Sequence, residues 1–138
     1  MLRMQTDVVN SRETVTAIWL VRGDDERIEV PLYVDSSGEL VPYEMRPGDS
    51  LTLTVRDVPD AASPIILQVT SAPGQTVIPI RHADTKDLPL GRYSADIQLC
   101  TADGLRKTVW PDFEAGNSNR WRARNTRNFY LVSEVTML

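Results

Sequence analysis

Residues 87–110 constrain the fold more than any other part of the chain, because they predict a β-hairpin. Tyr93, Ala95, Ile97 and Leu99 alternate with polar or small side chains, which is the period-two pattern of a strand with one buried face. The dipeptide at 103–104, Asp-Gly, favours the positive φ angles of a tight two-residue turn. A second strand then follows and reaches Trp110.

The predicted turn fixes the register of the two strands. A two-residue loop places Leu99 opposite Thr108 and Ile97 opposite Trp110. Cross-strand partners share a face, so Ala95, Ile97, Leu99 and Trp110 are expected together on the core side of a sheet.

Just before the hairpin, Leu88, Gly91 and Tyr93 have the spacing of a tyrosine corner. In immunoglobulin-like sandwiches this tyrosine donates its hydroxyl to a backbone group a few residues upstream. We therefore expect the Tyr93 hydroxyl to bond the backbone between about residues 84 and 90. The simpler interpretation is a strand that happens to begin with tyrosine.

Length and composition indicate one ordinary globular domain. The chain has 138 residues, 41% hydrophobic and 25% charged, which is enough to bury a core. Its net charge of −4 gives no general attraction for nucleic acid or anionic membranes. Its apolar runs are too short for a transmembrane helix, and its start lacks the apolar stretch of a signal peptide.

Short strands separated by turns predict an all-β, immunoglobulin-like antiparallel sandwich over residues 14–114. Alternating patterns occur at 15–21, 28–34, 51–55, 65–70 and 77–81, with turn residues between them. Pro31 cannot donate to a β ladder, so we expect an edge or an irregularity there. Residues 82–88 could hold one helical turn. Residues 1–13 show no sustained pattern and are expected to be a loose or partner-bound leader.

Residues 115–138 form a different segment, an arginine-rich linker followed by a β-prone arm. The arm could fold back on its own sheet or add to the sheet of a neighbouring subunit. We expect the second, in a homo-oligomer in which the arginines meet acidic surface such as residues 24–26 of the adjacent copy; simple solvated flexibility is the alternative for the linker. The candidate partner-contact residues are Arg120, Trp121, Arg122, Arg124, Arg127, Phe129 and Tyr130.

Nothing in the sequence marks a catalytic, metal or cofactor site. His82 is the single histidine and Cys100 the single cysteine, and neither stands in a nucleophile or zinc motif. The acids at 24–26 lack the ligand spacing of a calcium loop. The arginine–tryptophan run near Trp121 could stack on single-stranded nucleic acid, but the acidic remainder of the chain argues against it. We therefore expect no enzyme, no cofactor, and neither nucleic acid nor membrane as partner.

Taken together, residues 15–113 resemble the N-terminal module of siphophage baseplate upper proteins and related immunoglobulin-like prophage tail domains. The resemblance rests on Gly23-Asp24, on the turn at 35–38, on the strand at 49–56, and on the Leu-x-x-Gly-x-Tyr-x-x-Asp-Ile-x-Leu segment at 88–99. It implies a structural adaptor located in the virion, bound to other tail proteins and without catalytic residues. The chain stops at 138, before the oligomerising and receptor-facing parts of the longer family members.

Two functions follow as hypotheses. The first is a non-enzymatic structural adaptor of a phage or prophage tail or baseplate. The alternative is a cell-surface or carbohydrate-binding sandwich, which needs exposed aromatic side chains on one face; Trp121 and Tyr130 are the candidates.

Overall fold

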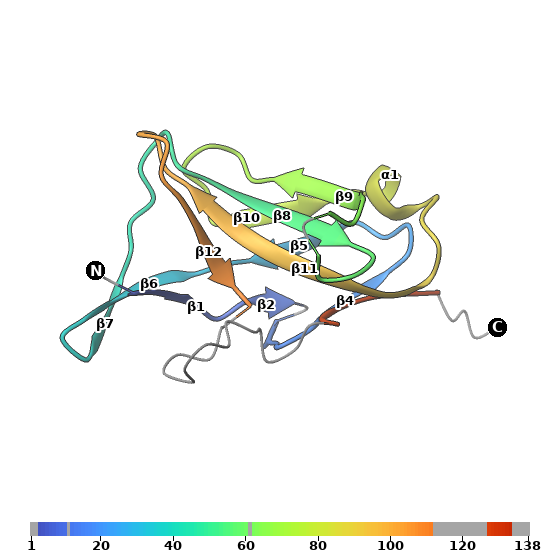
Figure 1. Ribbon diagram of the computed structural model, residues 1–138, viewed down its shortest axis with the longest axis horizontal. Coiled ribbons are helices and arrows are strands. Elements are labelled where there is room, and N and C mark those ends of the chain that lie inside the picture. The colour runs from blue at the N-terminus through green and yellow to red at the C-terminus, as the bar shows by residue number, and fades with distance from the viewer. Residues whose placement is uncertain (1–2, 11, 61, 112–126, 134–138) are drawn as a thin grey trace.

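The computed structural model describes residues 3–10, 12–60, 62–111 and 127–133, which form strands and one short helix (Figure 1). The elements in chain order are β1 (Arg3–Thr6), β2 (Val9–Asn10), β3 (Glu13–Thr14), β4 (Ile18–Val21), β5 (Glu26–Glu29), β6 (Leu32–Ser36), β7 (Glu39–Pro42), β8 (Ser50–Arg56), β9 (Ile65–Thr70), β10 (Val77–Ile80), α1 (His82–Thr85), β11 (Gly91–Cys100), β12 (Arg106–Trp110) and β13 (Phe129–Val132).

The fold is an all-β sandwich built on one large sheet. In the described residues its strand order is β4-β13-β11-β8-β9, and β12 also pairs with β11. β11 is the central strand and pairs with β8 from Ser94 to Cys100. All these pairings are antiparallel except that of β13 with β4, which is parallel.

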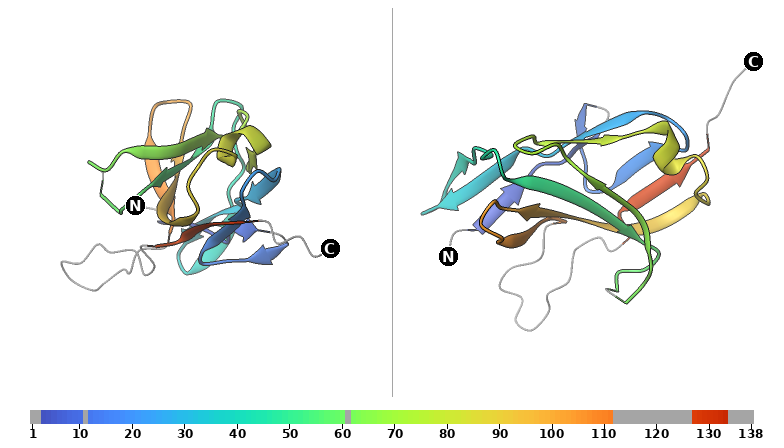
Figure 2. Two further views of the ribbon diagram at one scale, coloured as in Figure 1. Left: turned by 90° about the vertical axis from the view of Figure 1, so that its right-hand side faces the viewer. Right: turned by 90° about the horizontal axis from the view of Figure 1, so that it is seen from above.

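A second layer, β10-β5-β2-β3, shares one core with the large sheet, and a smaller sheet, β1-β6-β7, extends from it (Figures 1 and 2). Pro31 lies between β5 and β6, where the chain passes from one sheet to the other, so the irregularity predicted there is present. Its carbonyl accepts a hydrogen bond of 2.6 Å from the Thr6 hydroxyl. The predicted helical turn is α1.

The core faces of the two layers meet in a single apolar cluster. Alternate residues of β8 and β11 point into it, and on β11 these are Tyr93, Ala95, Ile97 and Leu99, all buried. Ile28 and Ile78 contribute from the second layer and are fully buried. The alternation predicted for the hairpin therefore identified the core face of the central strand.

The hairpin turn differs from the prediction. Gly104, at φ +90°, closes a three-residue loop in which Thr101 and Leu105 are the bonded pair, and Leu99 therefore faces Lys107 rather than Thr108. A bulge then adds one residue to β12 before Trp110, which restores the predicted pairing of Ile97 with Trp110. Both tryptophan and isoleucine are buried, as predicted.

A side chain completes the ladder between β12 and β13, which both lie along the same side of β11. β12 ends opposite Ile97 and β13 begins opposite Tyr93, which leaves Ala95 between them. The carboxamide of Asn128 fills that gap: its Oδ1 accepts from Ala95 N at 2.7 Å and its Nδ2 donates to Ala95 O at 2.9 Å. Asn128 is 1% exposed, and its own carbonyl accepts from Ile18 N.

Two predictions about the chain ends are wrong. Within residues 3–10 and 12–13 the leader is part of the fold, because β1 pairs with β6, β2 pairs with β5, and Val8 is buried. At 129–132 the C-terminal arm folds back on the sheet of its own chain rather than adding to that of a neighbouring subunit, because β13 lies inside the large sheet with Phe129 buried. Residues 115–126 and 134–138 lie outside the described residues.

The predicted tyrosine hydrogen bond is present. Tyr93 is buried, and its hydroxyl donates to the carbonyl of Pro89. Its ring meets that of Phe129 edge to face at 6.3 Å, so the corner also contacts β13. Leu88 packs partly against the core, whereas Gly91 is exposed.

We expect Tyr93→Phe to lower the free energy of unfolding by about 1–2 kcal/mol, because it removes a buried hydrogen bond and leaves the ring in place. Urea denaturation measures this directly. Tyr33→Phe, at a half-buried tyrosine on β6, is the control and should change stability by less than about 0.5 kcal/mol. Equal stabilities of Tyr93→Phe and the wild type would contradict the corner assignment.

Candidate functional site

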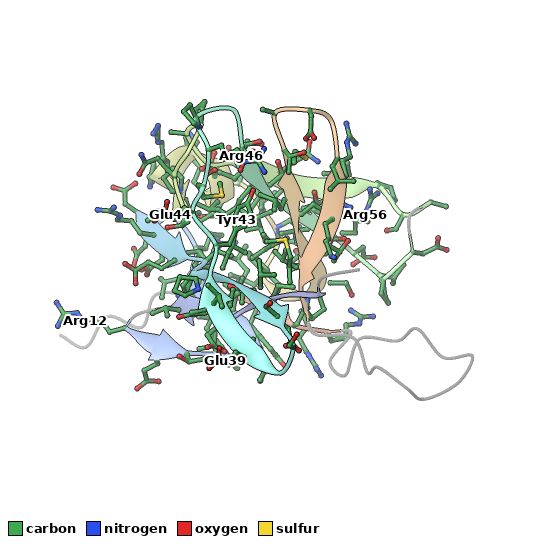
Figure 3. All side chains as sticks on the ribbon, turned by 90° about the vertical axis from the view of Figure 1, so that its left-hand side faces the viewer. Arg12, Glu39, Tyr43, Glu44, Arg46 and Arg56 are labelled. Carbon is green, nitrogen blue, oxygen red and sulfur yellow. The ribbon has the colours of Figure 1, made fainter. Side chains whose placement is uncertain are left out.

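Three clusters of polar or aromatic side chains are candidate sites. The first surrounds Asp49, at the end of the molecule shown in Figure 3, where Tyr43 and Arg46 come from the segment between β7 and β8. Asp49 is fully buried. Its carboxylate accepts from the Tyr43 hydroxyl at 2.7 Å, from Arg46 N at 3.0 Å and from Ala102 N at 3.1 Å.

These contacts make Asp49 a structural carboxylate. Burial disfavours its charge, but the hydrogen bonds from Arg46 N, Tyr43 and Ala102 N and the charge of Arg46 outweigh burial and lower its pKa. Burial and the same hydrogen bond raise the pKa of Tyr43. Close packing supports this interpretation, because a Cβ on Gly48 would lie 2.4 Å from that of Ala102.

The second cluster is a shallow hollow beside α1 of about 560 Å³, lined by Asp25, Glu26, Arg27, Pro79, Ile80 and Arg81. Its polar groups already hold the helix in place. Asp25 accepts from His82 N at 2.7 Å, and the His82 ring bonds the carbonyl of Gly23 at 2.6 Å. His82 is exposed, as predicted for a surface histidine. No group of three histidine, cysteine or acidic residues among the described residues is placed to hold a metal.

The third cluster is a row of side chains across three strands of the large sheet. Arg92 on β11 is paired with Tyr130 on β13, and Tyr130 is paired with Trp19 on β4. Residues paired across a sheet project from the same face, and the neighbours of Trp19, Ile18 and Leu20, are buried on the core side. The row therefore lies on the outer face. We call Arg92, Tyr130 and Trp19 the aromatic row.

The rings of the aromatic row are ordered by stacking. The Trp19 and Tyr130 rings are 4.0 Å apart and within 3° of parallel. The guanidinium carbon of Arg92 lies 5.0 Å from the centre of the Tyr130 ring, within the range of a cation–π interaction. The order is therefore arginine, tyrosine, tryptophan, with tyrosine in the middle.

Trp19 is the open end of the aromatic row. It is 53% exposed although one ring face is covered by Tyr130, so the exposed area belongs to the other face and the edges. β4 is the last strand on this side of the large sheet in the described part of the chain. A ligand can therefore reach the free face of the indole from the sheet margin.

The centre of the same outer face is polar. Asp96 projects from β11 opposite Thr54. Burial raises its pKa, and the charge of Arg56 partly offsets that effect. We assign this half-buried carboxyl no chemical role.

The structure brings together only part of the predicted contact set. Tyr130 is in the aromatic row, and Arg127 donates to the backbone carbonyl of Arg92 at 3.1 Å. Phe129 is a buried core residue, so its prediction as a partner contact is wrong. Arg120, Trp121, Arg122 and Arg124 lie outside the described residues.

Sequence reasoning missed Trp19 and Arg92. Trp19 stood in a predicted strand, on the parity shared with Val15, Ala17 and Val21, and Arg92 stood in the corner motif just before Tyr93. The missing information was the pairing of β4 with β13, because a parallel contact between segments more than 100 residues apart leaves no local signal.

Comparison with known proteins gave no family assignment: no family model matches the chain, and no curated protein sequence matches it. Within the described residues, no helix is long and apolar enough to cross a membrane. The resemblance to phage tail modules therefore stays a prediction from the sequence.

We expect Asp49→Asn to destabilise the fold at pH 7 by about 1.5–3 kcal/mol, because an amide cannot accept all three hydrogen bonds of the carboxylate. Since the pKa of Asp49 is lowered in the folded state, its contribution is present above the unfolded value of about 3.9 and is lost as the pH falls below it.

The stability difference between wild type and Asp49→Asn should therefore shrink as the pH is lowered from 7 to 3. Denaturation at several pH values measures that difference, and Asp60→Asn, in an exposed loop, is the control. A difference that stays constant over this range would show that the charge of Asp49 contributes nothing.

Proposed function

We propose that this chain is a non-enzymatic adaptor that binds another protein through the aromatic row. Tryptophan, tyrosine and arginine are the residue types that most often dominate the energy of protein interfaces. Here all three stand side by side on one exposed face. This juxtaposition is the observation on which the proposal rests.

The aromatic row suits binding because it is already ordered. A partner that covers Trp19 would remove a large apolar surface from water without first restricting a free side chain, since the indole is held by Tyr130. Arg92 adds a charge with donors beside the apolar surface. Flat aromatic surface with one cation fits an apolar patch bordered by a carboxylate on the partner.

The proposed setting is a phage or prophage tail or baseplate, in the virion. This part of the proposal is supported by the sequence resemblance alone. It directs the search for the partner to the proteins encoded by the genes flanking this one, such as tail-tube, tape-measure or baseplate components.

A second candidate function is carbohydrate binding, favoured by the free ring face of Trp19. The apolar C–H face of a sugar ring packs on an exposed aromatic ring, and nearby polar groups then fix the orientation of the sugar. Only one such face is offered, however, because Tyr130 lies between Trp19 and Arg92. A protein partner uses the whole row, and we therefore favour it.

The test is calorimetric titration of the purified chain with each protein encoded by the flanking genes. For the cognate partner, Trp19→Ala should raise the Kd by about 30-fold or more, the effect of losing a hot-spot residue. Leu105→Ala, at an exposed leucine on the β11–β12 loop, is the matched control and should leave the Kd unchanged.

Trp19→Ala must also remain folded, with a stability loss of no more than about 1.5 kcal/mol for the missing stacking pair. Partner binding unaffected by Trp19→Ala would overturn the proposed surface. Binding to a glycan array that disappears in Trp19→Ala, with no binding to the flanking-gene products, would favour the carbohydrate function instead.

A further inference from the structure

The free edge of β9 differs from the other free strand edges of the described residues. β7 ends in Pro42, β10 contains Pro79, and β12 carries the adjacent cations Arg106 and Lys107. The edge of β4 is occupied by the side chain of Asn10, which accepts from a backbone N–H of that strand. β1 and β3 are four and two residues long. These are the devices by which proteins prevent edge-to-edge pairing.

Most of β9 carries none of these features that prevent edge pairing. Its six residues, Ile-Ile-Leu-Gln-Val-Thr, include no proline, no glycine and no charge. It pairs with β8 on one side, and on the other it is the last strand of the large sheet among the residues that the structure describes (Figures 1 and 2). A bulge interrupts the pairing only at its first residues, near Ile65.

The ladder with β8 shows which backbone groups are free. Ser71 N donates to Leu51 O, so these two residues form a hydrogen-bonded pair. Hydrogen-bonded and non-bonded pairs alternate along an antiparallel ladder, and Thr70 and Gln68 therefore belong to non-bonded pairs with β8. Their N–H and C=O groups point away from β8, toward the open edge.

We propose that β9 pairs antiparallel with β9 of a second copy of this chain, across a two-fold axis at Gln68. In that register Gln68 meets Gln68 of the second copy, and Leu67 meets Val69. At the axis a polar side chain then opposes a polar one on the outer face, and on the core face the apolar side chains of Leu67 and Val69 oppose each other; one step further out, Ile66 meets Thr70.

The absence of charge on β9 suits a second copy as the occupant. A two-fold axis brings each residue near the axis close to its own copy, so any charged residue there would face a like charge. β9 is uncharged although the chain carries a net charge of −4, so two copies can approach along this strand without that repulsion. The backbone groups of Gln68 in the two copies would satisfy each other.

The interface is independent of the aromatic row. β9 and β4 are the two opposite margins of the large sheet, so pairing through β9 leaves Trp19 accessible. The dimer would present two aromatic rows, and an adaptor of that form binds two partners. If the aromatic row binds no partner, the proposed dimer is unaffected. If the chain does not dimerise through β9, the proposed partner binding is unaffected.

The test is analytical ultracentrifugation of the full chain over a range of concentrations. The wild type should show a monomer–dimer equilibrium. Gln68→Lys places two ammonium groups at the axis and should raise the dimer Kd by about tenfold or more. Gln68→Pro should also weaken the dimer, because it removes an N–H that β8 does not use.

Two variants serve as controls. Gln98→Lys puts the same charge on the same face of the sheet but on the central strand β11, and Trp19→Ala alters the other margin; both should dimerise like the wild type. A wild type that is monomeric at every concentration overturns the proposal. So does a dimer that Gln68→Lys leaves intact, because its interface would lie elsewhere.

Discussion

The carboxamide of Asn128 is the interaction on which the large sheet depends. Without it, the N–H and C=O of Ala95 would be buried and unpaired between two strands, at a cost of about 1–3 kcal/mol for each group. The carboxamide presents one N–H and its C=O to Ala95 in the arrangement of a peptide group, so it replaces the missing ladder residue. Through its backbone carbonyl the same residue also bonds β4. The parallel contact of β13 with β4, and with it the stacking of Tyr130 on Trp19, therefore begins at Asn128.

The two margins of the large sheet therefore have different proposed roles, partner binding at β4 and self-association at β9. At one margin β4 carries Trp19, held from behind by Tyr130 and Arg92, and we assign partner binding to this row. At the other margin β9 leaves its backbone groups open, and we assign self-association to that edge. The centre of the sheet, β8 and β11, pairs without interruption over seven residues and keeps the two margins in a fixed relation. Asp49 holds the loops at one end of the same two strands through Tyr43 and Ala102.

Local patterns predicted much of this fold, and long-range pairing explains the errors. The alternation of Tyr93 to Leu99 identified the core face, and the spacing of Leu88, Gly91 and Tyr93 located the corner, because both depend on residues close in sequence. The Asp-Gly dipeptide predicted a turn but not its length: Gly104 accommodates a three-residue loop as readily as a two-residue one. The N-terminal strands are too short to show a pattern, and they are ordered by pairing with β5 and β6.

Long-range strand pairing also explains why the sequence did not indicate Trp19 and Arg92 as site residues. Tyr130 was predicted as a contact residue because it stands in the β-prone C-terminal arm, whereas Trp19 and Arg92 become candidates only because β13 lies between β4 and β11. Phe129 and Tyr130 are adjacent in an apolar segment, and period two places one in the core and the other outside. Sequence alone could not choose between these parities, because they are set by the pairing of β13 with β11 and β4, whose residues lie far away in the sequence.

Amide hydrogen exchange of the Asn128→Ala variant tests this account most directly. Removal of the carboxamide should reduce the protection of the amides of β13 and β4 by about tenfold or more relative to the wild type, which is the effect of losing one buried hydrogen bond. The amides of β8 that pair with β9 should keep their protection. Unchanged protection of Ile18 to Val21 and of Phe129 to Val132 would contradict the central claim, because the aromatic row would then be held in place without Asn128.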